Sequence, residues 1–416
     1  MSTAPIPGGP FAALHYREFR ALAAGTFLLT IALLAQEVAL GYELYRLTRD
    51  PLVLGLIGLA EAIPFMALAL FGGHLADRRE KRGLIQMSLL VMLSGSALLL
   101  FATRPAARAQ LSQHSMLLLV YGTIMLLGFA RGIYSPTASS LKAFLVPREL
   151  YANSSTWAST AWQSGAIAGP AISGLLLAAL GFSGTLAVVM ALIAAVIGLT
   201  FVVAPRPVPP APAAHENLWA SLREGLHYVF RTRIILYSIS LDMFSVLFGG
   251  VVAILPVFAQ DILAVGPQGL GILRAAPAVG AVLTMLLLAW HPPTRRPWKT
   301  LLLVVLGFGI ATLVFGLSKN FWLSALALFF TGAFDSVSVV IRGTVLQMMT
   351  PDHLRGRVQS VNSIFLAASN ELGAFESGVA ARLLGAVPSV LFGGAVTVAT
   401  VGWVWRKSKE LFELRL

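Results

Sequence analysis

The sequence contains no cysteine and few charged side chains: only 12% of its 416 residues are Asp, Glu, Lys or Arg. Without cysteine, a disulfide framework, a thiolate metal site and a cysteine nucleophile are excluded. The seven histidines are scattered without the spacing of metal ligands. Hydrophobic residues make up 57% of the chain instead. A soluble protein of this size could not hide so much apolar surface, so the composition indicates an integral membrane protein.

Long apolar segments recur along the chain with short charged loops between them. In windows of about twenty residues, such a pattern predicts membrane-spanning helices. We expect twelve spans, in two sets of six, at 20–45, 52–74, 84–103, 116–141, 153–180, 184–204, and at 233–262, 268–290, 300–318, 321–348, 358–384 and 387–405. The predicted organisation is a six-helix bundle over residues 1–204, a cytoplasmic linker over 205–232 and a second six-helix bundle over 233–416.

The basic residues are distributed unequally between the two sides of the predicted spans. About 21 Lys and Arg residues lie on the side of the two termini and about five on the other side, a bias that places both termini in the cytoplasm. The net charge of +12 is therefore concentrated in loops rather than along one surface stripe, which argues against nucleic acid as a partner. Residues 1–19 contain no apolar stretch before a cleavage site, so we expect no cleavable signal peptide.

The predicted linker begins with a proline-rich stretch that cannot form a continuous helix. It continues with Leu218, Leu222, Leu226 and Val229 at helical spacing, which is typical of an amphipathic helix at a membrane surface. The alternative is a plain linker that does nothing beyond joining the two bundles.

The two halves contain an internal repeat. Residues 146–181 align without gaps to 350–385, a shift of 204 positions. The matched residues are Pro147, Leu150, Gly169, Gly174 and Gly181 with Pro351, Leu354, Gly373, Gly378 and Gly385; Gly128 also matches Gly332. Glycines let helices approach closely in a bilayer, so the repeat predicts the same helix packing in both halves. Parallel repeats of this kind are typical of carriers that work by alternating access.

The loop after the second span reads GGHLADRREKRG. Through Gly73, Asp77, Arg78, Lys81 and Arg82 it resembles the cytoplasmic signature of the major facilitator superfamily, and the resemblance covers nearly the whole chain. It implies an all-α membrane protein with twelve transmembrane helices in two pseudo-symmetric bundles. It also implies a gating role for Gly73, Asp77, Arg78 and Arg82; the alternative is that the basic residues only set the orientation in the membrane.

The fifth span contains Gly165, Gly169, Pro170 and Gly174, in the sequence GAIAGPAISG. This is similar to the glycine–proline signature of the superfamily's exporters and antiporters. A proline bends such a helix, and small residues permit sliding against a neighbouring helix. The second half has Ala374 in place of the proline, so only the first half carries the full pattern. Residues 37–64, 145–150 (LVPREL) and 351–361 (PDHLRGRVQSV) resemble the branch that holds enterobactin-exporter-like and macrolide-efflux-like carriers.

Several ionisable residues fall inside predicted spans, where exposure to lipid costs several kcal/mol. A carboxylate in a partly dry cavity can exchange a proton near neutral pH, so these residues are candidates for proton coupling or charge relay. They are Asp335, Glu371, Arg131, Arg342, Glu37 and Asp242. Arg131, Ser135 and Lys142 form one polar stripe at helical spacing. The alternative for each residue is a static salt bridge.

These features favour a monomeric, proton-coupled exporter in a bacterial cytoplasmic membrane. The expected partners are a small organic substrate (a drug, a macrolide or a siderophore-like compound), protons and the lipid bilayer; no cofactor is implied. Lipid or lysolipid transport is an alternative, and so is a membrane sensor or scaffold that transports nothing. The sequence has no phosphate-binding loop, zinc-protease motif or serine-hydrolase motif, which argues against an enzyme.

Overall fold

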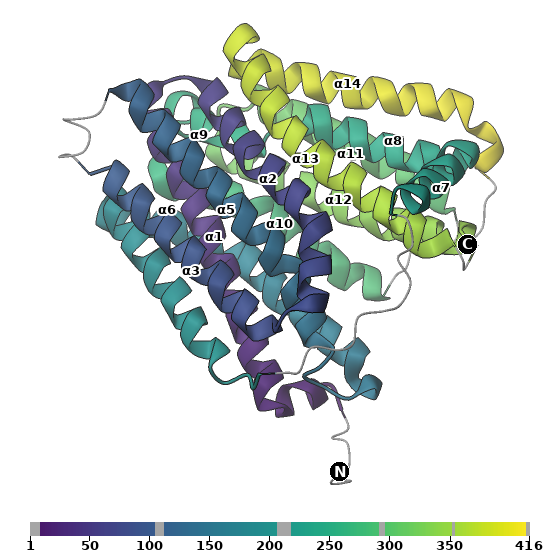
Figure 1. Cartoon of the computed structure of the whole chain (residues 1–416). Coiled ribbons are helices and arrows are strands. Elements are labelled where there is room, and N and C mark those ends of the chain that lie inside the picture. Colours follow the sequence, from purple (N-terminus) through teal and green to yellow (C-terminus); the bar gives the residue numbers. More distant parts are fainter. Residues whose placement is uncertain (1–8, 105–111, 206–217, 291–295, 352–353, 413–416) are drawn as a thin grey trace. The chain divides into compact units, whose positions relative to one another are not determined.

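The computed structural model describes residues 9–104, 112–205, 218–290, 296–351 and 354–412, without the side chains of 69–78, 218–222, 289, 356, 360 and 367. The regular structure of these residues is helical, with no strand among them (Figure 1). The long helices are α1 (Arg17–Thr48), α2 (Pro51–Arg78), α3 (Lys81–Ala102), α5 (Gln113–Lys142), α6 (Tyr151–Thr200), α7 (Leu218–Arg231), α8 (Arg233–Gly249), α10 (Gly266–Trp290), α11 (Pro297–Leu317), α12 (Phe321–Met349), α13 (Arg355–Leu384) and α14 (Ala386–Lys407).

Short helical segments join some of these helices. Between α8 and α10 the chain forms a 3-10 turn (Val252–Ile254), the short α9 (Leu255–Val257) and a π-helix (Phe258–Ile262). Further 3-10 turns lie at Ala12–His15, Arg148–Leu150 and Lys409–Leu411.

Ten helical segments of the described chain are long and apolar enough to cross a membrane. Two features account for the difference from the twelve predicted spans. Helix α6 covers the fifth and sixth spans and bends at Gly181, where φ is +67°. Helix α13 is 30 residues long, but its charged residues lower its mean hydropathy below that of a simple apolar span. The all-α, multi-span membrane architecture predicted from the sequence is confirmed.

The described chain forms two compact units: Met1–Glu43 with Ala60–Ala211, and Leu44–Leu59 with Pro212–Leu416. The first unit therefore holds most of the first six spans. The end of α1 and the beginning of α2 are part of the second unit. Residues 206–217 of the predicted linker lie outside the described residues, and the boundaries at 204 and 232 stay a prediction.

In the first unit, α3 packs against both α5 and α6 (Figure 1). In the second unit, α12 packs between α10 and α11, and α14 packs on α8 and α11. The largest fully buried side chain there is Trp298, whose indole nitrogen donates a hydrogen bond to Ser408 Oγ at 2.8 Å. Because Tyr237, Trp405 and Phe412 pack around the same core, the second unit has a well-filled centre.

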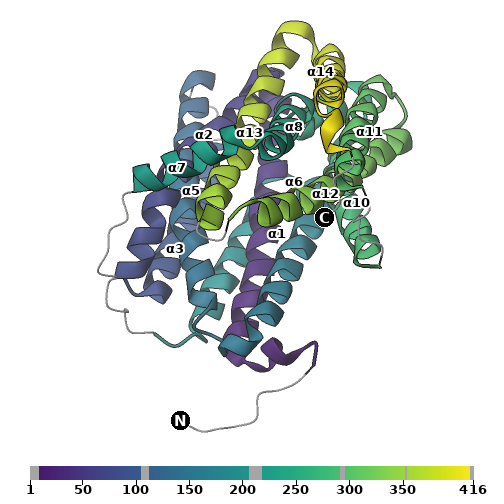
Figure 2. The same cartoon turned by 90° about the vertical axis from the view of Figure 1, so that its right-hand side faces the viewer.

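The amphipathic helix predicted in the linker is α7, which lies across α13 in the second unit (Figure 2). Val229 is buried against the core, and the Tyr228 hydroxyl donates to the Met349 carbonyl at 2.5 Å. Glu224 forms an ion pair with Arg357 of α13. The apolar face of α7 is therefore covered by protein at Val229, whereas Leu226 is exposed.

The repeat read from the sequence corresponds to equivalent helix packing in the two units. A Cβ at Gly128 of α5 would lie 2.3 Å from the Glu61 carbonyl oxygen of α2, and one at Gly332 of α12 would lie 1.9 Å from the Pro277 carbonyl oxygen of α10. Gly181 and Gly385 both have positive φ, at +67° and +96°, where a side chain would be strained.

A second matched pair of close approaches joins α6 to α1 and α13 to α8. Gly169 lies against Ile31 in the first unit, and Gly373 lies against Val246 in the second. Glycine at these positions allows the backbones to touch, which is how helices associate in lipid.

Candidate functional site

A cavity of about 310 Å³ lies in the first unit, between α1, α2, α5 and α6. We call it the α1–α5–α6 cavity, after the helices that supply most of its wall. Its lining residues are Leu22, Thr26, Leu29, Thr30, Leu33, Phe65, Arg131, Tyr134, Ser135, Ala138, Ser139, Lys142, Ala158 and Trp162. Apolar walls with a few convergent polar groups are typical of small-molecule sites, and this volume is at the lower end of their usual range.

Arg131 and Glu61 form an ion pair at this cavity. The guanidinium also lies over the ring of Phe65, 5.8 Å from the ring centroid. Glu61 was not among the candidate residues taken from the sequence. It is positioned by the close contact between α2 and α5 at Gly128, one turn before Arg131.

The polar stripe predicted on the fourth span lines this cavity: Arg131, Ser135 and Lys142 are all part of its wall. The ammonium of Lys142 donates to Ser155 Oγ at 3.1 Å. Trp162 of α6 also lies in the wall and is 53% exposed. The cavity therefore combines cationic, hydroxyl and aromatic groups.

The second unit contains a group that we call the carboxylate–arginine cluster, formed by Asp242 of α8 with Asp335 and Arg342 of α12. One terminal nitrogen of Arg342 is 2.6 Å from Asp242 Oδ2, and the two side chains are only 6% and 7% exposed. The other terminal nitrogen is 3.9 Å from Asp335 Oδ1, and this carboxylate is 46% exposed. Arg342 also donates from Nε to Ser338 Oγ at 3.1 Å.

The terminal nitrogen of Arg342 that faces Asp335 is buried and makes no hydrogen bond within the described part of the chain. A small cavity of about 10 Å³ lies beside it, lined by Asp242, Ser245, Asp335 and Ser338 together with apolar residues. This volume is about that of one water-sized sphere. Arg342 thus pairs closely with Asp242, while the carboxylate of Asp335 lies just beyond hydrogen-bond distance of the same guanidinium.

The two remaining candidate carboxylates lie elsewhere. In the second unit, Glu371 faces Gly58 of α2: its Oε2 is 3.4 Å from where a Cβ at Gly58 would be. In the first unit, Glu37 of α1 is half-buried and follows Gln36, whose amide oxygen accepts a hydrogen bond from Ser96 at 2.6 Å. Among the described residues, no group of three or more His, Asp or Glu side chains is arranged to hold a metal ion.

A polar cluster that sequence reasoning missed surrounds Asp261 in the π-helix of the second unit. Asp261 accepts a hydrogen bond from the Tyr45 hydroxyl and pairs with Arg49 at 2.5 Å. Nearby in the chain, Asp50 pairs with Arg382 of α13 at 3.3 Å. Arg49 has a left-handed backbone with φ of +52°, which is uncommon for a side chain of this size. These contacts explain why residues 44–59 belong to the second unit.

A sequence profile described as "Major Facilitator Superfamily" matches residues 19–374 of the chain. The chain belongs to the Major Facilitator Superfamily. The enterobactin exporter EntS of Shigella boydii is 26% identical over 378 residues, which cover 90% of this chain and 86% of that protein. The protein is therefore an integral membrane transporter that resembles this exporter.

Solved structures of the superfamily's fold agree with the arrangement of helices. A crystal structure of a POT family transporter in complex with a thioalcohol-conjugated peptide has a TM-score of 0.74 at 12% identity, covering 95% of this chain and 96% of that chain. The D-xylose–proton symporter has a TM-score of 0.72 at 14% identity, covering 96% and 100%. At these identities the likeness establishes the fold alone.

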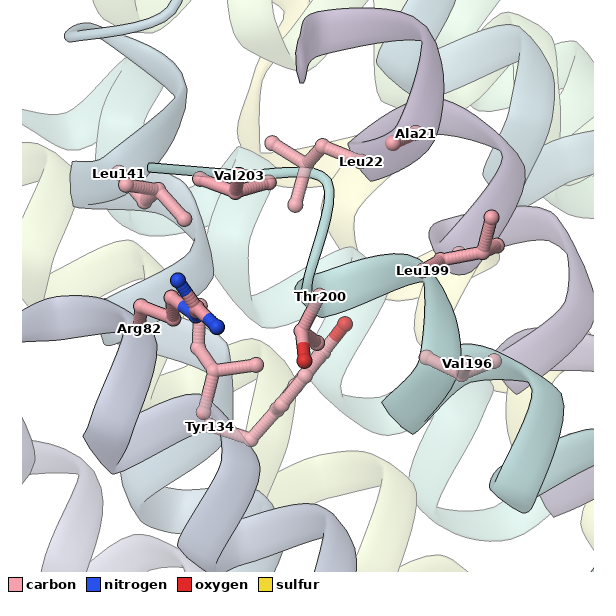
Figure 3. Close-up of a pocket in the computed structure, with 11 residues that line it drawn as sticks. Ala21, Leu22, Arg82, Tyr134, Leu141, Val196, Leu199, Thr200 and Val203 are labelled. Atoms are coloured by element: carbon pink, nitrogen blue, oxygen red, sulfur yellow. The ribbon is translucent and has the colours of Figure 1, made fainter. Parts of the chain in front are cut away.

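The superfamily's cytoplasmic signature lies at the end of α2 and the start of α3. The side chains of Gly73, Asp77 and Arg78 lie outside the described residues, so their gating role stays a prediction. Arg82 is described: its guanidinium lies over the ring of Phe201, 5.2 Å from the centroid. It lines a small pocket of about 20 Å³ with Tyr134 and Thr200 (Figure 3). Arg82 thus contacts the end of α6 within its own unit.

The glycine–proline residues singled out in the fifth predicted span hold α6 close to α1. A Cβ at Gly165 would lie 2.7 Å from Thr30 Cβ, and Gly169 and Pro170 are buried a turn further along. Gly174 is buried too, and its neighbour Ser173 donates to the Ala35 carbonyl at 2.8 Å. The equivalent Ser377 donates to the Gly250 carbonyl at 2.8 Å. This serine pair is an identity in the repeat that the sequence comparison overlooked.

Proposed function

We propose that the protein is a secondary active exporter that moves a small organic molecule out of the cell in exchange for protons. The observation that carries the proposal is the carboxylate–arginine cluster inside the helices of a superfamily transporter. Ionisable residues in such positions are costly, and they commonly mark ion or proton pathways. The α1–α5–α6 cavity supplies a separate place for an organic cargo.

The geometry of the cluster suggests how a proton is handled. Asp242 is fully paired, whereas Asp335 is partly exposed and lies 3.9 Å from the same guanidinium. One arginine cannot neutralise two ionised carboxylates, so the cluster carries an excess negative charge until one of them binds a proton. We assign that proton to Asp335. Binding and release there change the charge of the cluster and bias the carrier between its two access states.

The direction of transport is inferred from two features. A relative that aligns over 90% of the chain is named an enterobactin exporter, and the first unit carries a glycine–proline pattern similar to that of exporters and antiporters. Candidate cargoes are an enterobactin-like siderophore, a macrolide or a drug. Lipid transport would call for a largely apolar cavity, whereas the wall here carries Arg131 and Lys142. That observation favours a water-soluble organic cargo.

The remaining parts of the proposal concern the setting of the protein. We place it as a monomer in the bacterial cytoplasmic membrane, with both termini in the cytoplasm, because basic residues are concentrated on that side. Bundles at 1–204 and 233–416 would alternate access around the cargo. The loop containing Asp77 would act as the cytoplasmic gate.

Cellular efflux tests this function. Bacterial cells that express the protein are loaded with enterobactin, erythromycin or fluorescein, and the retained compound is measured with and without a protonophore. We expect the protein to lower retention of at least one compound, and the protonophore to restore it. Asp335→Asn should abolish efflux. Glu410→Gln is the matched control, because Glu410 makes an exposed ion pair with Arg233.

Three outcomes would refute the proposal. The first is equal retention of all three compounds with and without the protein. The second is efflux that the protonophore leaves unchanged. The third is an Asp335→Asn variant that exports as well as the Glu410→Gln control, which would remove Asp335 from the proton pathway.

A further inference from the structure

The α1–α5–α6 cavity has an uneven balance of charge. Its lining includes two cations, Arg131 and Lys142, and no carboxylate among the residues described as lining it. Glu61 pairs with Arg131 and offsets one positive charge. Lys142 has a different environment: its ammonium donates to the neutral hydroxyl of Ser155, and no described carboxylate lies within ion-pair distance. Among the described residues, the charge of Lys142 therefore has no counter-charge at this cavity.

An uncompensated ammonium in a partly enclosed site attracts anions. Low-dielectric walls strengthen such an attraction relative to bulk water. Lys142 lies in the last turn of α5, and Arg131 lies three turns earlier on the same helix. Ser135 and Ser139 lie between them and also line the cavity. One side of the cavity thus offers an anion two hydroxyl groups, those of Ser135 and Ser139, followed by the ammonium of Lys142.

The other side of the cavity offers aromatic surface. The indole of Trp162 is 53% exposed, and Tyr134 and Phe65 also belong to the wall. The guanidinium of Arg131 already lies over the ring of Phe65. The aromatic rings that a ligand can contact are therefore those of Trp162 and Tyr134. Aromatic faces bind planar rings by offset or edge contacts. A ligand that matches both sides has a planar ring and a negatively charged substituent.

We propose that the α1–α5–α6 cavity selects an aromatic organic anion, such as an arene carboxylate or phenolate, over neutral or cationic molecules of the same size. Lys142 is the residue that sets this preference. The inference rests on the proposed export function for its biological meaning. It narrows the cargo within the classes named above, because it disfavours cationic drugs and amine-bearing macrolides such as erythromycin at this site.

Two xanthene dyes of similar ring system and opposite charge test the proposal: fluorescein, an anion, and rhodamine 123, a cation. Purified protein in phosphatidylcholine nanodiscs is titrated against each dye and fluorescence anisotropy is measured, with empty nanodiscs as the blank. We expect fluorescein to bind more tightly by about 10-fold. Lys142→Gln should weaken fluorescein binding by about 10-fold, as expected for loss of a charge-assisted contact, and leave rhodamine 123 unchanged.

Two control variants distinguish an effect of Lys142 in the cavity from an effect of the protein's overall positive charge on dye binding. Arg148→Gln removes an exposed cation in the segment between α5 and α6, six residues after Lys142. Arg148 does not line the cavity, so this substitution should change the affinity for neither dye. Lys142→Arg keeps the charge and should retain the preference for fluorescein. Equal binding of the two dyes, or equal effects of Lys142→Gln and Arg148→Gln, would overturn the proposal.

Comparing dye binding in nanodiscs with proton-driven efflux distinguishes a failure of this inference from a failure of the proposed export function. Binding in nanodiscs needs no gradient, so a failure of proton-driven efflux with an intact fluorescein preference would refute export and leave the anion site. Proton-driven efflux with no charge preference in the cavity would refute the anion site and leave export.

Discussion

Arg342 and Asp242 form an ion pair at 2.6 Å in which both side chains are almost completely buried. Such a pair is stabilised only while both partners are present, because removing one leaves an uncompensated charge away from water. Asp335 approaches the same guanidinium at 3.9 Å from a more exposed position. The two carboxylates around one arginine therefore differ in distance and exposure, and we propose that Asp242 holds the arginine while Asp335 exchanges the proton.

This difference predicts unequal effects on stability. Asp242→Asn should lower the free energy of unfolding by about 3–5 kcal/mol, the usual cost of breaking a buried pair. Asp335→Asn should cost much less, because it removes a longer and more exposed contact. Thermal unfolding of the purified variants in a neutral detergent measures the difference. Equal destabilisation by the two substitutions would contradict the assignment.

The pair also predicts coupling between its two members. Arg342→Gln alone should destabilise the protein, since it leaves Asp242 buried without a partner. Combining it with Asp242→Asn should restore about 1–3 kcal/mol relative to the sum of the single changes, because Asp242, the more buried of the two carboxylates, then no longer carries a charge without a partner. A double-mutant cycle of unfolding free energies measures the coupling. A strictly additive result would mean that the two side chains do not interact in the folded protein.

The matched glycines predict paired folding defects. Gly128→Ala and Gly332→Ala would place a Cβ 2.3 Å and 1.9 Å from backbone carbonyl oxygens, which the backbone cannot accommodate without moving a helix. Both should sharply reduce the yield of monodisperse protein on size-exclusion chromatography. Gly122→Ala in α5 and Gly343→Ala in α12 are matched controls, because nothing lies within 4 Å of a Cβ there. Normal yields of Gly128→Ala and Gly332→Ala would show that the packing described is not that of the folded protein.

The serine pair predicts a smaller and symmetrical effect. Ser173→Ala and Ser377→Ala each remove one hydrogen bond between helices, a contact worth about 0.6 kcal/mol on average in membrane proteins and at most about 1.7 kcal/mol. Ser363→Ala, in α13 with an exposed hydroxyl bonded to its own helix, should have no effect. Thermal stability of the three variants provides the comparison. A larger loss for Ser363→Ala than for Ser377→Ala would count against the shared role of the pair.

Hydropathy and charge predicted the helices well because lipid imposes a simple length and polarity rule on each span. Even α13 was predicted as a span, at 358–384, although Arg355, Glu371 and Arg382 make it less apolar than a simple span. The fifth and eleventh predicted spans end at 180 and 384, directly before the matched glycines Gly181 and Gly385. The positive φ of these two residues is the physical reason for the bend in α6 and the end of α13.

The site could be predicted only in part. The sequence named Asp242, Asp335 and Arg342 as separate candidates, and its spacing placed Arg131, Ser135 and Lys142 on one face of a helix. It could not reveal partners from other helices, so Glu61 was missed beside Arg131, and the pairing of Asp242 with Arg342 was not predicted. The Tyr45–Asp261 contact joins residues 216 positions apart, and nothing local in the sequence indicates it. Long-range pairings of this kind come from the packing of helices, which single-sequence periodicity does not encode.

The central claim, proton-coupled export, is tested most directly in proteoliposomes. Vesicles containing the purified protein are loaded with enterobactin or fluorescein, an inwardly directed proton gradient is imposed, and loss of the compound and internal acidification are followed together. We predict that at least one compound leaves faster with the gradient, that protons enter with it, and that Asp335→Asn abolishes both movements. Efflux at the same rate with and without the gradient, or no protein-dependent efflux of either compound, would contradict the account.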